Sequence, residues 1–146
     1  MSSKLLEMKE GVIEAGIDGE WRPIVNGLSL ALEKGEIVGL IGESGAGKST
    51  LGLAALGYTK PGCRIVSGSI KLDGLELTTL PEKQLRQLRG NRVSYVAQSA
   101  AAAFKPAHRL LEQVSESPVQ HGKMKRTEAA LKGRSLYRQL DLPDPE

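Results

Sequence analysis

The sequence predicts an α/β fold in which a glycine-rich loop joins a buried strand to a helix. Residues 37–41 form a short apolar run, typical of a buried strand in a parallel sheet. The loop follows over residues 42–50, and residues 51–56 have the apolar spacing of a packed helix. Turn formers and alternating residues before this segment predict antiparallel strands, and the pattern after residue 98 becomes helical.

Composition restricts the class of protein. A chain of 146 residues with 40% hydrophobic and 25% charged residues is an ordinary globular domain. Its net charge of +3 suits a polyanionic ligand but is too small to indicate nucleic acid. The single cysteine, Cys63, excludes an internal disulfide and suits a reducing compartment. Because no apolar run is long enough for a bilayer or a signal peptide, we expect a cytoplasmic chain that reaches a membrane only through a partner.

The first part, residues 4–36, is expected to be mainly antiparallel β. Asp18-Gly19 lies between two candidate strands, 11–17 and 20–25, and is a strong signal for a hairpin turn. Asn26-Gly27 is expected to form another turn. A further half-buried strand is indicated by alternating leucines, at Leu28, Leu30 and Leu32.

The elements after the glycine-rich loop alternate between strand and helix. Residues 67–72 predict an edge strand that ends in an Asp73-Gly74 turn, and Pro81 is expected to open a helix. Residues 92–97 form a second apolar strand. Gln98 follows at its C-terminal end, where ligand-facing residues lie in a parallel sheet.

The last part of the chain is expected to be helical. Residues 110–114 predict a helix that ends before Pro118. Thr127 is expected to cap a final helix. The apolar face of this helix is predicted at four positions, Ala130, Leu131, Leu136 and Leu140.

The glycine-rich loop carries the main chemical signal. Its sequence is Gly42-Glu43-Ser44-Gly45-Ala46-Gly47-Lys48-Ser49-Thr50, which matches the phosphate-binding pattern G-x-x-x-x-G-K-[ST]. Gly42, Gly45 and Gly47 let the backbone curl around phosphates, and the N–H groups of the following helix attract their charge. Lys48 is expected near the β- and γ-phosphates, Ser49 on Mg²⁺, and Thr50 on the phosphates. The loop therefore predicts a P-loop core that binds the triphosphate of a nucleotide with Mg²⁺.

These segments in this order resemble the ATP-binding subunit of an ABC transporter, in particular the group that takes up oligopeptides, dipeptides and nickel. The resemblance covers nearly the whole chain. It rests on residues 36–49 as the Walker A region, on Gly68-Ser69-Ile70 with Leu72-Asp73-Gly74, and on Leu80-Pro81-Glu82 leading to Arg89-Gly90. Val96-Ala97-Gln98 with Phe104-Lys105-Pro106 is similar to the Q-loop region of that group.

The resemblance implies an antiparallel β subdomain (4–36), a nucleotide-binding core with interleaved β (37–98) and the start of a helical subdomain (99–146). It also implies permease partners, a second ATP-binding subunit, and a place on the inner face of the cell membrane without direct insertion. Gln98 would sense the γ-phosphate, through Mg²⁺ or the attacking water. Trp21 is the only aromatic residue before Lys48, and either stacks on adenine or covers the hairpin.

Some motifs of the family do not occur in this sequence. It contains no Leu-Ser-Gly-Gly-Gln-type signature and no run of four apolar residues followed by Asp-Glu. His108 and His121 precede the place of the family's switch histidine. We therefore expect residues 1–146 to be the N-terminal part of one longer ATP-binding domain, with an incomplete parallel sheet, that binds ATP but hydrolyses it little by itself.

Two other functions are compatible with a phosphate-binding loop. A small-molecule kinase would need a cluster of basic residues for its acceptor, for which Arg86, Arg89 and Arg92 are the candidates. A non-enzymatic ATP-binding regulator could contact nucleic acid through its basic residues Lys123, Lys125 and Arg126. No interleaved aromatic residues support base stacking at that cluster, so nucleic acid is not expected as a partner.

Overall fold

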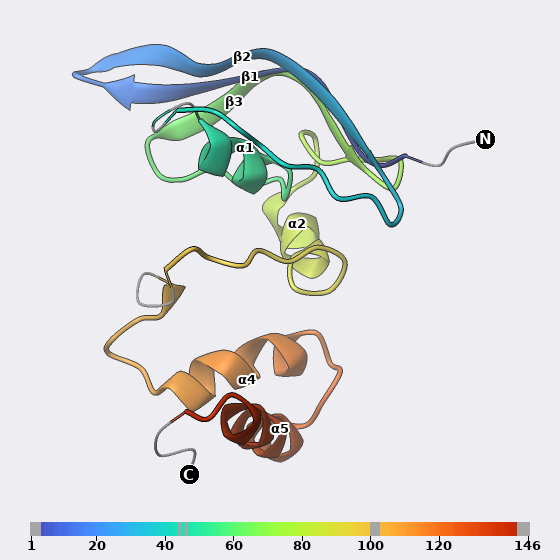
Figure 1. Ribbon diagram of the computed structural model, residues 1–146, viewed down its shortest axis with the longest axis vertical. Coiled ribbons are helices and arrows are strands. Elements are labelled where there is room, and N and C mark those ends of the chain that lie inside the picture. Colours follow the sequence, from blue (N-terminus) through green and yellow to red (C-terminus); the bar gives the residue numbers. More distant parts are fainter. Residues whose placement is uncertain (1–3, 44, 46, 100–102, 143–146) are drawn as a thin grey trace. The chain divides into compact units, whose positions relative to one another are not determined.

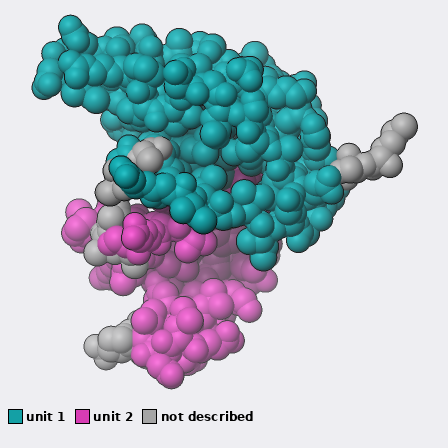
Figure 2. Space-filling model, turned by 45° about the horizontal axis from the view of Figure 1, so that its top comes forward, with its two compact units in different colours: residues 1–89 teal, residues 90–146 magenta. Residues whose placement is uncertain are grey.

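The computed structural model describes residues 4–43, 45, 47–99 and 103–142. The chain divides into two compact units, Met1–Arg89 and Gly90–Glu146, which Figure 2 shows in teal and magenta. Unit 1 holds the β-sheet and the glycine-rich loop, and unit 2 holds the C-terminal helices. Each unit is described by itself.

Unit 1 is built on a four-stranded sheet with the strand order β2-β1-β3-β4. All of its pairings are antiparallel. Asp18 (φ 53°) and Gly19 (φ 82°) form the turn between the first two strands, so the predicted hairpin is confirmed. The strands are β1 (Lys4–Ile17), β2 (Glu20–Glu33), β3 (Cys63–Leu72) and β4 (Leu75–Glu76).

Two details of the predicted β region were wrong. Asn26-Gly27 is not a turn, because β2 runs through it and Gly27 (φ 64°) takes up the irregularity inside the strand. β3 begins at Cys63 instead of residue 67 and lies between β1 and β4, so it is not the edge strand. The predicted Asp73-Gly74 turn is present, with φ angles of 49° and 81°.

The middle of the sheet is bent where β1 and β3 cross most closely. The pairing register shifts between Lys9 and Val12, and Gly68 (φ 94°) faces this irregularity. A Cβ atom on Gly68 would lie 2.5 Å from the Glu10 carbonyl oxygen and 2.6 Å from that of Lys9. Only glycine fits this position, because both neighbouring atoms belong to the backbone.

Helices α1 (Lys48–Ala54) and α2 (Glu82–Leu88) complete unit 1. Figure 1 shows α1 against one face of the sheet formed by β1, β2 and β3. Apolar side chains from the sheet and from both helices are buried, including Met8, Ile13, Val25, Leu51, Leu53, Ile70 and Leu85. This aliphatic layer is the core of the unit, and its burial is the main stabilising contribution.

Arg89 ties the end of α2 to the end of α1. Its guanidinium donates hydrogen bonds to the backbone carbonyls of Leu56 and Gly57 and to the carboxylate of Glu82. Hydrogen bonds from Arg89 and then Arg86 lower the pKa of Glu82 below its usual value. The two helix ends are thereby held together by one side chain.

The two predicted parallel strands are absent from the described residues. Residues 37–41 pair with no other described segment, and Ile37 and Ile41 are 96% and 100% exposed. Residues 92–97 also form no regular strand, and Val96 is 91% exposed. A parallel strand needs a ladder of hydrogen bonds from a neighbour. Among the described residues, 37–41 have no such ladder, and 92–97 have only an isolated bridge at Val93, whose carbonyl accepts a hydrogen bond from Gly90 N–H (2.8 Å).

Unit 2 consists mainly of α4 (Leu110–Gln120) packed against α5 (Arg126–Gln139). Gly133 allows the close approach, because a Cβ atom there would lie 2.9 Å from Leu111 Cδ1. Ser115 is buried at this contact and donates a hydrogen bond to the carbonyl of Leu111 (2.6 Å). The helix pair is thus joined by small residues.

Three predictions about these helices were wrong. α4 continues through Pro118, and the carbonyl of Pro118 is used by the backbone N–H groups that follow the helix. α5 begins at Arg126 with Lys125 as N-cap, so Thr127 is not the cap. Leu131 and Leu140 are 66% and 69% exposed, because α5 packs through Ala129 and Gly133. In the part of the chain that the structure describes, no helix is both long and apolar enough to span a membrane.

Candidate nucleotide-binding site

The glycine-rich loop is bent at two glycines with left-handed backbone angles. Gly45 has a φ of 85° and Gly47 a φ of 77°, which L-residues rarely adopt. Gly47 immediately precedes α1, and its carbonyl accepts the first helical hydrogen bond from Leu51 N–H (2.8 Å). Ser44 and Ala46 lie outside the described residues. The described part of the loop is therefore curved, with its end at the start of α1.

Strand β2 supports the end of this loop. A Cβ atom on Gly47 would lie 2.8 Å from the carbonyl oxygen of Ile24 and 3.0 Å from Val25 Cγ2. Val25 is buried in the core, so this contact anchors the loop to the sheet. The sequence interpretation missed this support, because no local signal relates Gly47 to a strand more than twenty residues earlier.

Lys48 folds back over the first half of the loop. Its Nζ donates hydrogen bonds to the backbone carbonyls of Gly42 and Glu43, both at 2.6 Å. The N-cap of α1 is Gly47, and no side chain of the described residues caps this N-terminus. The ammonium thus lies inside the curve of the loop, where a phosphate group would meet a positive charge.

Ser49 and Thr50 occupy the first turn of α1. Ser49 is exposed and Thr50 is half-buried. Within the described residues, no group of three or more His, Cys, Asp or Glu side chains is placed to hold a metal ion. The role of the Ser49 hydroxyl as a Mg²⁺ ligand stays a prediction.

Trp21 lies on β2 near the tip of the hairpin and is 46% exposed. The guanidinium of Arg64 lies over its ring, 4.1 Å from the centroid. Arg64 in turn donates hydrogen bonds to Glu14 from Nε (3.1 Å) and Nη2 (2.8 Å). Trp21 therefore covers part of the hairpin, and its stacking on adenine stays a prediction. The sequence interpretation missed Arg64, because it comes from a different strand.

Gln98 lies in unit 2, in an exposed segment without regular structure. Lys48 and Gln98 therefore belong to different units, and the role of Gln98 stays a prediction.

Unit 2 contains a groove of about 810 Å³. Gln113 holds the loop at its rim, because its side chain bonds the backbone of Lys105 (2.8 and 3.0 Å) and the carbonyl of His108 (3.0 Å). The groove is lined by both apolar and charged residues: Phe104, Leu111, Val119 and Ala130, and Lys105, Glu112, Glu116 and Arg126.

Two of the three arginines considered for the acceptor site of a kinase, Arg86 and Arg89, meet at one carboxylate in unit 1. Arg86 pairs with Glu82 (3.1 Å), and Arg89 also bonds Glu82 and two backbone carbonyls. Both guanidinium groups are thus committed to structural contacts. Arg92, the third candidate, is exposed and belongs to unit 2.

The fold of the chain is that of an ABC ATPase cassette. It superposes on the solved structure described as the dimeric structure of MJ0796, a bacterial ABC transporter cassette, with a TM-score of 0.76 and 20% identity over 95% of this chain and 58% of that one. A post-hydrolysis state of the same cassette, bound to ADP and Pi, gives a TM-score of 0.70 with 20% identity, over 91% of this chain and 57% of that one. The predicted fold class is confirmed.

The family profile described as ABC transporter matches residues 25–143, so the chain belongs to the ABC transporter family. It is 33% identical to the probable peptide ABC transporter ATP-binding protein y4tR of Sinorhizobium fredii, over 84% of this chain and 37% of that protein. It is 36% identical to the oligopeptide transport ATP-binding protein AppD of Bacillus subtilis, over 81% of this chain and 36% of that protein. It is also 36% identical to the probable D,D-dipeptide transport ATP-binding protein DdpD of Escherichia coli, over 88% of this chain and 39% of that protein. The chain thus spans less than half the length of these relatives.

Proposed function

We propose that this chain binds the triphosphate of ATP in its glycine-rich loop and acts as part of the ATP-binding subunit of a peptide importer. The observation that carries this proposal is the loop geometry: Gly45 and Gly47 have left-handed backbone angles, and Lys48 Nζ folds back to lie 2.6 Å from the carbonyls of Gly42 and Glu43. A triphosphate would exchange these carbonyls for phosphate oxygens, which form stronger, charge-assisted hydrogen bonds with an ammonium. Relatives named as peptide-transport ATP-binding proteins support the transport role.

The residues of the loop fit a magnesium-bound triphosphate. Gly45 and Gly47 turn the backbone without adding side chains, and Lys48 supplies the positive charge. Ser49, with Gln98 proposed from unit 2, would hold Mg²⁺, which neutralises charge on the β- and γ-phosphates when bound. Trp21 is proposed to stack on the base, which leaves the phosphates at the loop.

A titration of ATP and Mg²⁺ against the chain tests the proposal. The chain contains one tryptophan, so its fluorescence and the heat of binding are two independent readouts of the same titration. Lys48→Ala should weaken binding by about 10- to 100-fold, because it removes charge-assisted hydrogen bonds to phosphate. Lys60→Ala removes an equal charge from an exposed position in unit 1 and should leave binding unchanged. Equal affinities for the two variants would refute the proposed site.

We infer that this chain by itself supports binding more than turnover. Hydrolysis requires Mg²⁺ held on both sides and a positioned water, and only Lys48, Ser49 and Gln98 are candidates for these tasks here. A sensitive phosphate-release assay should therefore show little hydrolysis by the chain alone. Turnover that disappears in Lys48→Ala but not in Lys60→Ala would contradict this inference.

We further propose that the groove of unit 2 contributes to the contact with a permease. It includes Phe104 and Lys105, which belong to the segment similar to the Q-loop region. A complete importer would place this subunit at the inner face of the membrane, paired with a second ATP-binding subunit. Retention by membranes that carry the transmembrane subunits, and release from a polyanion column at moderate salt, would favour this role over that of a nucleic-acid-binding regulator.

A further inference from the structure

Three side chains from three neighbouring strands meet at the hairpin end of the sheet: Trp21 of β2, Glu14 of β1 and Arg64 of β3. In the pairing register Gly16 lies opposite Trp21, and Glu14 lies opposite Arg64. The ring of Trp21 reaches across Gly16, where a Cβ atom would lie 3.9 Å from Cζ3 and 4.0 Å from Cη2. These are ordinary van der Waals distances, so the indole lies directly over Gly16 on its way toward Arg64.

This cluster is open to solvent in spite of its defined geometry. Trp21 is 46% exposed, and the side chain of Arg64 is 51% exposed. The carboxylate of Glu14 is more sheltered, with 20% of its side chain exposed, and holds the guanidinium through two hydrogen bonds. A planar cation thus lies over an aromatic ring, and two hydrogen bonds to Glu14 hold this cation in place.

The cluster lies within reach of the glycine-rich loop along β2. The loop contacts this strand at Ile24, through the close approach of Gly47 to its carbonyl. Trp21 precedes Ile24 by three residues, which corresponds to about 10 Å of extended strand. Because β2 is at the edge of the sheet, a ligand that begins in the loop can pass beside the strand toward Trp21.

We propose that Arg64 is a nucleotide-binding residue that holds the base against Trp21 in a three-layer stack. The proposal rests on the function proposed above. A base between the two planes would stack at about 3.5–4.0 Å from each, so the guanidinium would move from 4.1 Å to about 7–8 Å from the indole. The Arg64 side chain is half exposed, and release of its two hydrogen bonds to Glu14 would allow this movement. Its charge also favours an anionic ligand.

The experiment compares the affinity of the chain for ATP with its affinity for inorganic tripolyphosphate, each with Mg²⁺, by calorimetry. The ratio of the two affinities isolates the contribution of the base and ribose. In Arg64→Ala this ratio should fall by about three- to tenfold, with tripolyphosphate binding unchanged, because one stacking surface is lost. Arg64→Lys, which keeps the charge and removes the plane, should lower the ratio by an intermediate factor.

Arg22→Ala is the matched control. Arg22 neighbours Trp21 in sequence, pairs with Glu20 at 3.3 Å, and lies opposite Ala15 on the other face of the strand pair. Removal of this charge should leave the ratio unchanged, and circular dichroism verifies that every variant is folded. An unchanged or increased ratio in Arg64→Ala overturns the role of Arg64.

The two proposals fail in different ways. If the wild-type chain binds neither ATP nor tripolyphosphate, the phosphate site is wrong, and the base contact is refuted with it. If the wild-type chain binds both equally, the loop site stands and only the base-binding role of Arg64 and Trp21 is overturned.

Discussion

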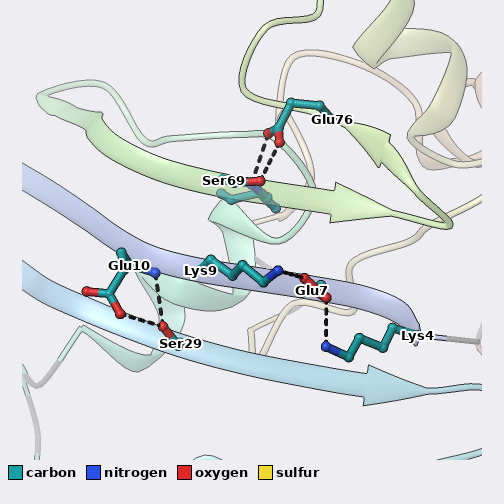
Figure 3. A network of polar contacts seen from close by, with 8 residues as sticks. Lys4, Glu7, Lys9, Glu10, Ser29, Ser69 and Glu76 are labelled. Carbon is teal, nitrogen blue, oxygen red and sulfur yellow. Dashed lines mark hydrogen bonds and ion pairs between the residues drawn. The ribbon is translucent and has the colours of Figure 1, made fainter. Parts of the chain in front are cut away.

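The carboxylate of Glu76 joins the short strand β4 to β3 and should make the stability of unit 1 depend on pH. Oε1 accepts hydrogen bonds from Ile70 N–H (3.0 Å), Thr78 N–H (3.3 Å) and the Thr78 hydroxyl (2.6 Å). Oε2 accepts one from the Ser69 hydroxyl, as Figure 3 shows. Burial raises the pKa of Glu76, but these hydrogen bonds outweigh it and lower the pKa to about 2, from 4.5.

Glu76→Gln tests the contribution of the charge without removing the side chain. The amide oxygen of Gln still accepts from Ile70 and Thr78, and the amide nitrogen can donate to the Ser69 oxygen. The full difference between pKa values of 4.5 and about 2 corresponds to a contribution of at most ~3.4 kcal/mol to the free energy of unfolding. Because the carboxylate is only partly buried, solvent screening reduces the expected loss of unfolding free energy to about 1–2 kcal/mol.

The direction of the pH effect follows from the lowered pKa. A carboxyl group with a folded pKa below its unfolded pKa stabilises the fold above about pH 4.5, and this stabilisation is lost as the pH falls toward 2. At pH 3 roughly two-fifths of the effect at pH 7 should remain. Glu76→Gln has no carboxyl group to titrate at this position. The difference in unfolding free energy between wild type and this variant should therefore shrink by more than half between pH 7 and pH 3.

Urea unfolding followed by circular dichroism at pH 7 and pH 3 measures this difference. Glu20→Gln is the control, because its carboxylate is 73% exposed and its ion pair with Arg22 is a surface contact. That variant should differ from wild type by about 0.5 kcal/mol or less at either pH. If Glu76→Gln is as stable as wild type at pH 7, or if its deficit is the same at pH 3, the assignment of the charge effect to Glu76 is wrong.

Three further predictions concern backbone fit, helix packing and surface charge. Gly68→Ala should lower the unfolding free energy by about 2–4 kcal/mol, because the position has a positive φ and the new Cβ would overlap two backbone carbonyls. Gly62→Ala is the control: its φ is similar but the space around it is open, so it should cost about 1 kcal/mol. Equal urea midpoints for the two variants would refute the overlap argument. Gly133→Leu should separate α4 from α5 and lower the melting temperature of the chain, measured by helical circular dichroism, and an unchanged temperature would contradict the packing. Hydrogen bonds from Lys4 and then Lys9 lower the pKa of Glu7 to about 2 (Figure 3). Lys4→Met should therefore raise the pKa of Glu7 toward 4.5, as measured by an NMR titration. An unchanged pKa would contradict the contact between Lys4 and Glu7.

Features set by neighbouring residues were predictable from the sequence. The Asp18-Gly19 turn needs two successive residues that tolerate positive φ, and this requirement is visible in the dipeptide itself. The Asp73-Gly74 turn follows the same rule. The glycine-rich loop likewise combines local backbone freedom with a lysine at fixed spacing, so its position and curvature could be predicted without knowledge of the sheet.

Features set by distant residues were not predictable in the same way. Gly27 and Asp18-Gly19 carry similar turn signals, yet β2 passes through Gly27, because its pairing with β1 continues on both sides. Residues 37–41 have the apolar composition of a buried strand and nevertheless pair with no other segment that the structure describes, since composition does not specify a ladder partner. On α5 the positions of the leucines predicted the packed face. In the structure α5 contacts α4 at Gly133 instead, because the two helices approach too closely there for a larger side chain.

The glycine-rich loop shows how the local and the distant terms combine in one site. Its curvature comes from Gly45 and Gly47, but its position relative to the sheet comes from the contact between Gly47 and Ile24 of β2. That contact places the loop on the strand that carries Trp21, and Trp21 in turn meets Arg64 from β3. The local motif therefore predicts where phosphates bind, whereas any preference for a base depends on strand pairing. For this reason tripolyphosphate and ATP should respond differently to changes in the sheet.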